Sequence, residues 1–447
     1  MKNYMKIPLI IFFIVISLIT FCSDEEYALV LSGGGARGAY QIGVWKALKQ
    51  LDINITGSYG TSVGAINAAA VALEEYEQAR TLWLNIDYDD VMDLSPELED
   101  IFRGHLSNLS LTDLEKGMGQ LFRGIDVEPL RKKLDEIISE SEVRKSKIDY
   151  GLVAFSISDM KPRTLHIDEI PEGELIDYIL ASAGLPIFKH EEIEGEIFID
   201  GGVYNNIPIN LALDRGFENI IIVDIGSIGD LTTKITNFIE NRKYDGTYNT
   251  VFIRPRKFYG NIISFDPDIA SNFIKEGYLD TLAAFNILKG KTYYIYIKED
   301  TLFHLFVNLS SDLRIKALKI MSLESPENVS AEYQYYRLLL PQLEHTAGTV
   351  FDHPVITSVN ILEDLASYLQ IDPLYPYDSH SILKKIDEKT DNKQKMSLLK
   401  ELIEEVRYGK VLQLVDFLFE NSGYAFPRED QYYEIEVTFN DLTNIEK

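Results

Sequence analysis

The pattern of apolar and polar residues predicts alternating strands and helices in the first part of the chain. Residues 27–32 form a short apolar run that ends at three glycines, which is typical of a buried strand. Apolar positions then recur at helical spacing across residues 36–51. A second candidate strand, at 53–59, runs into a glycine turn and is followed by an alanine-rich stretch of high helix propensity. Two consecutive strand–turn–helix units predict an α/β fold with a mainly parallel sheet.

The pattern beyond residue 80 predicts the rest of this domain and a different region after it. Residues 80–148 have mostly polar, helical patterns. The further expected elements are strands at 151–157 and 163–167, a helix at 174–183, and strands at 197–199 and 220–225. After about residue 300 the chain becomes acidic and helical in pattern. We therefore expect residues 300–447 to form a mostly helical C-terminal region, whose role the sequence does not indicate.

The N-terminus is typical of an export signal. Lys2 and Lys6 precede an uncharged apolar run at 7–21, which is shorter than the ~20 residues needed to span a bilayer. Cys22 follows this run and resembles the lipidated cysteine of a bacterial lipoprotein, although Phe21 departs from the small residue usual at that position. Residues 1–22 are expected to be a signal peptide or lipoprotein signal, with an uncleaved anchor as the alternative. The expected location is membrane-associated, periplasmic or secreted.

Composition and charge exclude several classes of function. The 447 residues include 43 Lys and Arg but 70 Asp and Glu, giving a formal net charge of −27. Such a surface repels phosphate backbones, so we expect no nucleic-acid partner and no polybasic attachment to anionic lipid. The single cysteine excludes an intramolecular disulfide and a cysteine-rich metal site.

A G-x-S-x-G motif lies between the second expected strand and the helix after it. Gly60 and Gly64 flank Ser62 in this motif. A sharp strand-to-helix turn needs small neighbours, projects the serine hydroxyl, and leaves free N–H groups of the helix N-terminus beside it. The strand–turn–helix context therefore favours Ser62 as a nucleophile.

A glycine-rich loop follows the first expected strand. Its residues are Gly33, Gly34, Gly35, Ala36, Arg37 and Gly38. The spacing also fits a dinucleotide-binding fingerprint, but the second strand then ends in a serine motif instead of an acidic residue. The alternative is an oxyanion hole, in which the N–H groups of Gly34 and Gly35 stabilise the negative charge of a tetrahedral intermediate. Arg37 is expected either to add charge there or to fix the shape of the loop.

A serine nucleophile needs a base, and the sequence offers two choices. Asp200 ends an expected strand and precedes Gly201 and Gly202, which places its carboxylate at the sheet edge where α/β active sites form. An Asp-Gly-Gly sequence also occurs in plain turns. His190 lies close to Asp200 in sequence, so a Ser-His-Asp triad stays open as the alternative.

Taken in order, the three motifs resemble those of the patatin-like phospholipase family. Residues 181–188 and 265–278 are also similar to family segments, and the resemblance covers roughly residues 27–290. It implies a three-layer α/β fold and a Ser62–Asp200 dyad that forms an acyl-enzyme without metal or cofactor. It also implies an oxyanion hole in the loop from Gly33 to Gly38, a lipid substrate and contact with a membrane surface.

Two other functions fit the same motifs. A broad-range carboxylesterase would cleave short soluble esters and ignore intact diacyl lipids. A non-catalytic lipid-binding protein would keep the fold without turnover, although every motif position is filled. The sequence does not indicate the acyl position, the headgroup or the oligomeric state.

Overall fold

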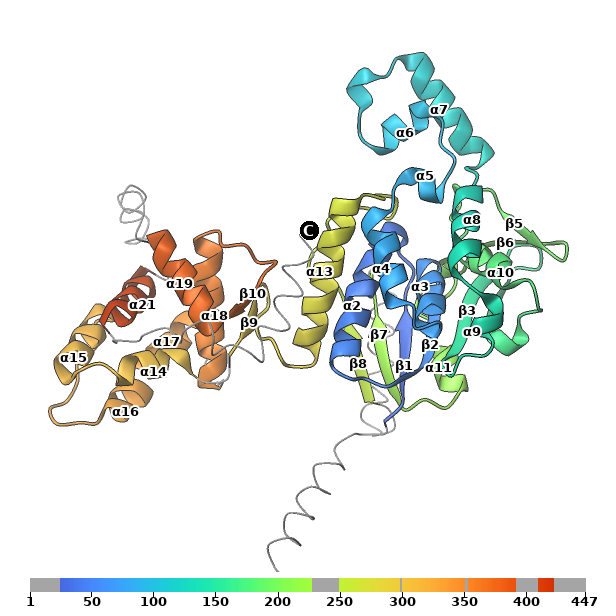
Figure 1. The fold of residues 1–447 in the computed structure, drawn as a ribbon. Helices are drawn as coiled ribbons and strands as arrows, with labels where there is room; N and C mark the ends of the chain where they lie inside the picture. Colours follow the sequence, from blue (N-terminus) through green and yellow to red (C-terminus); the bar gives the residue numbers. More distant parts are fainter. Residues whose placement is uncertain (1–24, 227–248, 298–299, 350–352, 391–408, 422–447) are drawn as a thin grey trace, which may run out of the picture. The chain divides into compact units, whose positions relative to one another are not determined.

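The computed structural model describes residues 25–226, 249–297, 300–349, 353–390 and 409–421. The chain divides into two units, Met1–Ile274 and Lys275–Lys447 (Figure 1). The expected export signal and Cys22 lie outside the described residues. Of the helices that the structure describes, none has both the length and the apolar character needed to cross a membrane.

An eight-stranded sheet forms the centre of the first unit. Its strands are β1 (Tyr27–Leu31), β2 (Ile55–Thr61), β3 (Asp149–Ser156), β4 (Lys161–His166), β5 (Glu191–Ile193), β6 (Glu196–Asp200), β7 (Asn219–Val223) and β8 (Asn249–Ile253). The order is β5-β6-β3-β2-β1-β7-β8, and β4 pairs with β3. Strands β1, β2, β3, β7 and β8 pair in parallel, whereas β4, β5 and β6 join by antiparallel pairing. The predicted α/β class with a mainly parallel sheet is confirmed.

Helices cover both faces of this sheet. The first unit contains α2 (Ala39–Gln50), α3 (Val63–Ala72), α4 (Tyr76–Asn85), α5 (Tyr88–Val91), α6 (Pro96–Phe102), α7 (Leu111–Arg123), α8 (Glu128–Ile137), α9 (Glu140–Val143), α10 (Leu175–Ser182) and α11 (Ile209–Asp214), with 3-10 turns η1 (Gly35–Gly38), η2 (Leu106–Asn108), η3 (Ile167–Glu169) and η4 (Gly201–Val203). Neighbouring residues of a strand face opposite sides. In β3, Gly151 faces Leu211 of α11, while the preceding residue, Tyr150, donates a 3.1 Å hydrogen bond to the carbonyl of Ala65 in α3. The sheet is thus the middle of three layers.

Residues 94–125 form a helical hairpin, here called the α6–α7 hairpin, between α5 and α8 (Figure 1). Ser95 caps α6, and Ser110 caps α7 in a reciprocal arrangement with Asp113. Gly117 allows the two helices to approach, because a side chain there would meet Ile101. The ends of the hairpin meet where the N–H group of Asp93 donates to the carbonyl of Asp126 at 2.9 Å.

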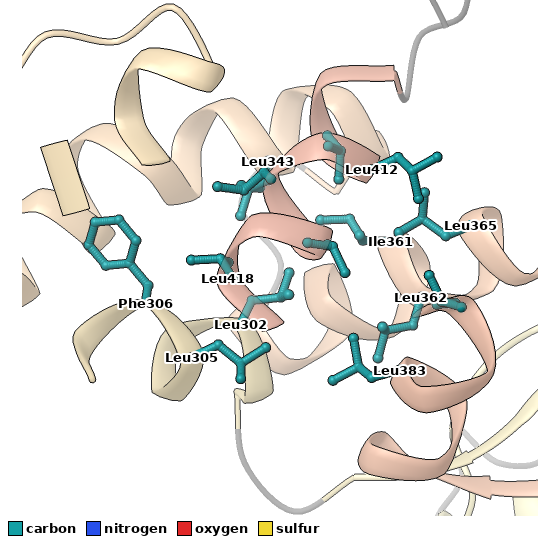
Figure 2. Close-up of a cluster of buried hydrophobic side chains, with 14 of the residues drawn as sticks. Leu302, Leu305, Phe306, Leu343, Ile361, Leu362, Leu365, Leu383, Leu412 and Leu418 are labelled. Atoms are coloured by element: carbon teal, nitrogen blue, oxygen red, sulfur yellow. The ribbon is translucent and has the colours of Figure 1, made fainter. Parts of the chain in front are cut away.

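The second unit is built mainly from helices. It contains most of α13 (Pro267–Ala284), then α14 (Thr301–Val307), α15 (Ser311–Ile320), α16 (Ala331–Tyr333), the π-helix η5 (Gln334–Leu339), α17 (Leu340–Ala347), α18 (Pro354–Tyr368), α19 (Ser379–Thr390) and α21 (Gly409–Asn421). Two short strands, β9 (Tyr294–Tyr296) and β10 (Pro376–Asp378), pair in parallel. Leucines of α14, α17, α18, α19 and α21 converge on one apolar core (Figure 2). This unit therefore has a hydrophobic core of its own.

Candidate active site

Ser62 lies at a sharp turn between β2 and α3. Its backbone has φ 57° and ψ −130°, a conformation that side-chain-bearing residues rarely adopt. A Cβ atom on Gly60 would collide with the backbone of Gly64, and one on Gly64 would collide with the carbonyl of Leu31. The G-x-S-x-G motif thus has the geometry of a nucleophile elbow, in which close backbone packing requires both glycines.

The pairing of β3 brings the end of β6 to this elbow. Thr61, the last residue of β2, pairs with Val153, and Asp200, the last residue of β6, pairs with the next residue, Ala154. β4 pairs with one edge of β3 here, so β2 and β6 both pair with the opposite edge of β3, one after the other along it. β6 runs opposite to β2, so the final residues of the two strands are neighbours. Asp200 therefore lies beside Ser62.

Ser62 and Asp200 interact directly. The Ser62 hydroxyl lies close enough to the Asp200 carboxylate to lower its pKa, and Asp200 is only 6% exposed. Burial raises the pKa of Asp200 to about 6, against the lowering effects of the Ser62 hydroxyl and of the N–H group of Gly202, which lies 2.7 Å from the carboxylate. Gly201 and Gly202 begin the turn η4, which directs this N–H group to the carboxylate. A carboxylate with this pKa can accept a proton from the hydroxyl near neutral pH.

The end of α10 holds both residues in place, which the sequence reasoning did not identify. The Ser182 hydroxyl accepts from the N–H group of Ser62 at 2.9 Å and donates to the carbonyl of Val153 at 2.6 Å. Two residues later, the carbonyl of Gly184 accepts from the N–H group of Asp200 at 2.8 Å. The only signal for this role was that residues 181–188 resemble a family segment.

The glycine-rich loop lies next to the elbow. A Cβ atom on Gly33 would lie 2.9 Å from the Cβ atom of Ser62. Gly35 has φ +58°, and a side chain there would collide with the carbonyl of Ile262. The N–H group of Gly33 donates to the carbonyl of Asn206, but those of Gly34 and Gly35 have no acceptor in the described part of the chain. Two unpaired N–H groups beside a serine can bind an oxyanion.

Arg37 and Gly38 contribute to the loop in other ways. The Arg37 guanidinium lies 4.3 Å over the ring of Phe258 and donates to the carbonyl of Gly260 at 3.4 Å. These contacts fit the expectation that Arg37 fixes the loop shape. Gly38 lies against the ring of Trp83, where a Cβ atom would come within 2.7 Å of that ring. Its position therefore indicates a packing role.

An apolar cavity opens beside Ser62, here called the Ser62 cavity. It encloses about 590 Å³ of empty space, part of it open to solvent. Its lining residues are Gly35, Ser62, Val63, Ile66, Leu82, Trp83, Ile86, Val91, Leu130, Leu134, Ala183, Leu185, Phe188 and Phe265. Apart from Gly35 and Ser62, every lining side chain is apolar. Such a cavity suits a hydrocarbon chain bound next to the serine.

His190 is placed differently from Asp200. Its side chain is exposed at the surface, whereas Asp200 is buried beside Ser62. Within the residues that the structure describes, no group of three His, Cys, Asp or Glu side chains could hold a metal ion.

This fold and site define a class: α/β proteins with a serine at a strand-to-helix elbow and a carboxylate as its partner. Residues 29–213 match the model of the patatin-like phospholipase family. The matched segment contains all three motifs, and the match confirms the resemblance drawn from them.

Similar proteins are known from other organisms. Patatin-like phospholipase domain-containing protein 7 of Rattus norvegicus is 28% identical over 223 residues, which cover 48% of this chain and 14% of that protein. A lysophospholipase of Saccharomyces cerevisiae is 25% identical over 283 residues, covering 62% of this chain and 15% of that protein. This chain thus spans only a small part of the length of these relatives. The crystal structure of VipD from Legionella pneumophila matches at 15% identity and a TM-score of 0.38, covering 91% of this chain and 93% of that one.

Proposed function

We propose that this protein is a serine lipid acyl hydrolase of the phospholipase A or lysophospholipase type. One observation carries the proposal. The hydroxyl of Ser62, beside the buried carboxylate of Asp200, lies in the wall of a cavity whose other side chains are apolar. A nucleophile with an adjacent base is the requirement for covalent acyl transfer, and the apolar lining favours a long acyl chain.

In the proposed first step, the Ser62 oxygen attacks the ester carbonyl carbon. Its proton passes to Asp200, and the alcohol portion of the lipid leaves with that proton. In the second step, Asp200 takes a proton from water, whose oxygen attacks the acyl-serine ester. The fatty acid is released and Ser62 recovers its proton, so the net reaction consumes one ester and one water.

The oxyanion of each tetrahedral intermediate needs hydrogen-bond donors. The N–H groups of Gly34 and Gly35 are unpaired among the described residues, and so is that of Val63, the first residue of α3. Val63 also lines the Ser62 cavity. The residue after the nucleophile commonly supplies one oxyanion donor, which the sequence reasoning did not include.

Fatty-acid release from micelles tests this proposal. The full chain would be given phospholipid, lysophospholipid and a short soluble ester, and the released acid measured for each. Release from either lipid supports a lipid hydrolase. Cleavage of the short ester alone would instead favour a carboxylesterase, and no cleavage by folded protein would favour a non-catalytic lipid-binding role.

Narrowing the Ser62 cavity should select against long acyl chains. Leu130 on α8 lines this cavity, whereas Ile137 on the same helix lines a separate one. The larger side chain of Leu130→Trp should exclude two methylenes of the acyl chain from the cavity, which costs about 1.6 kcal/mol of binding free energy. We therefore expect kcat/KM for a sixteen-carbon ester to fall roughly 15-fold. A four-carbon ester should be affected little. Ile137→Trp is the matched control, and an equal loss in that variant would contradict the assignment of the Ser62 cavity to the acyl chain.

The rate should depend on the protonation of Asp200. Burial raises the pKa of this carboxyl to about 6, and only the carboxylate can accept the Ser62 proton. The rate should therefore be nearly constant above about pH 7 and fall roughly tenfold between about pH 7 and pH 5. The measurement is kcat/KM against pH with an uncharged ester. A profile that stays flat to about pH 4 would exclude a base with a raised pKa.

A further inference from the structure

The α6–α7 hairpin exposes large apolar side chains that the proposed chemistry does not use. Leu111 is 81% exposed and Phe122 is 85% exposed, and Leu106 and Met118 are also exposed. In α7, Leu111, Met118 and Phe122 are seven and four residues apart, so they share one side of the helix. Exposed apolar groups gathered on one element mark a contact surface more often than scattered ones do.

The base of the hairpin is attached to the wall of the Ser62 cavity. The N–H group of Ile125 donates to the carbonyl of Ile187, and the N–H group of Lys189 donates to the carbonyl of Ile125. Phe188, between these two partners, lines the cavity. Val91 and Leu130, which flank the two ends of the hairpin in sequence, line it as well. The exposed side chains thus belong to an element that starts and ends at the cavity wall.

The charges on the hairpin suit a zwitterionic surface. Arg123, next to Phe122, is exposed and forms no ion pair with any residue in the described part of the chain. In contrast, Lys116 pairs with Glu97 at 3.5 Å. The exposed Glu115 lies on the same side of α7 as Leu111. The guanidinium of Arg123 matches the phosphate of a zwitterionic headgroup, and the carboxylate of Glu115 matches its ammonium group. Both charges lie beside the exposed apolar side chains of α7.

We propose that Leu106, Leu111, Met118 and Phe122 insert into a zwitterionic phospholipid surface and hold the Ser62 cavity against it. This inference rests on the proposed lipid hydrolase function, because it gives the lipid a route from the surface to Ser62. The phospholipid surface contacts these four side chains together with Glu115 and Arg123, while the Ser62 cavity receives one acyl chain.

A fluorophore at position 122 tests the insertion without requiring catalysis. Cys22 is the only cysteine, so full-length Cys22→Ala, Ser62→Ala protein accepts a single polarity-sensitive label at Phe122→Cys. Met160→Cys provides the matched control, since Met160 is 71% exposed on the turn between β3 and β4. With phosphatidylcholine vesicles, the label at 122 should shift to shorter wavelength and the label at 160 should not.

Each other outcome contradicts the proposal. An unshifted label at 122 overturns it, whether or not the protein sediments with the vesicles. A shift at 122 that occurs without vesicles and grows with protein concentration would mean that a second copy of the chain covers these apolar side chains. A shift at both positions would mean non-specific adsorption. Ester hydrolysis by the parent chain in solution is measured separately, so failure of the catalytic proposal is distinguishable from failure of this one.

A second pair of variants measures how much the exposed apolar side chains of α7 contribute to vesicle binding. Leu111→Ser with Phe122→Ser should weaken vesicle binding by about tenfold or more, because both side chains lose their transfer into hydrocarbon. Met160→Ser should bind like the parent. Equal binding by both variants would place the lipid contact elsewhere on the chain.

Discussion

Ser62→Ala is expected to lower kcat/KM for ester hydrolysis by about 1,000-fold or more, with the fold intact. The substitution removes the side-chain oxygen that would form the proposed acyl-enzyme. The contact that positions the turn survives, because Ser182 accepts from the backbone N–H group of residue 62. The loss should therefore appear in kcat and not in thermal stability.

The measurement is steady-state hydrolysis of a soluble ester, with thermal unfolding of the same samples. Ser141→Ala is the matched control, because Ser141 is an exposed serine whose hydroxyl contacts Ser139 alone among the described residues. Hydrolysis by Ser62→Ala at the rate of the parent would mean that another group attacks the ester.

Asp200→Asn is expected to lower the rate by about 100- to 10,000-fold, the range for removal of a general base. The amide keeps the size of the carboxyl and can still accept from the N–H group of Gly202, but it cannot take the Ser62 proton.

His190→Ala separates a dyad from a triad. On the dyad account this surface substitution leaves the rate near that of the parent. The measurement is kcat/KM for Asp200→Asn and for His190→Ala, with circular dichroism to confirm that both variants fold. A loss in His190→Ala as large as that in Ser62→Ala would favour the Ser-His-Asp alternative.

Much of the fold and of the candidate site was predictable because it depends on local pattern. Residues 27–31 and 220–223 are continuous apolar runs, which are typical of buried parallel strands, and both fall on strands of the sheet. Gly60 and Gly64 signalled the elbow because the backbone packing there admits no side chain. Local sequence carries such requirements directly.

The relation between Asp200 and Ser62 could not be derived in detail from the sequence. The expectation was that both lie at the carboxyl edge of the sheet. In the structure, β6 runs antiparallel to β3 and reaches that edge from the opposite direction. Strand direction depends on pairing between distant segments, which local periodicity does not report. The contact of Ser182 with Ser62 was missed for the same reason, since 120 residues separate them in sequence.

The most direct test of the central claim is to locate the modification left by a long-chain alkyl fluorophosphonate. This reagent mimics the lipid ester and leaves a stable phosphonyl group on an activated serine. We predict one adduct per chain, on the peptide that contains Ser62. Fatty-acid release should fall in proportion to the fraction of chains that carry this adduct. An adduct on another residue, or release that continues after Ser62 is fully modified, would contradict the assignment of Ser62 as the nucleophile of a lipid hydrolase.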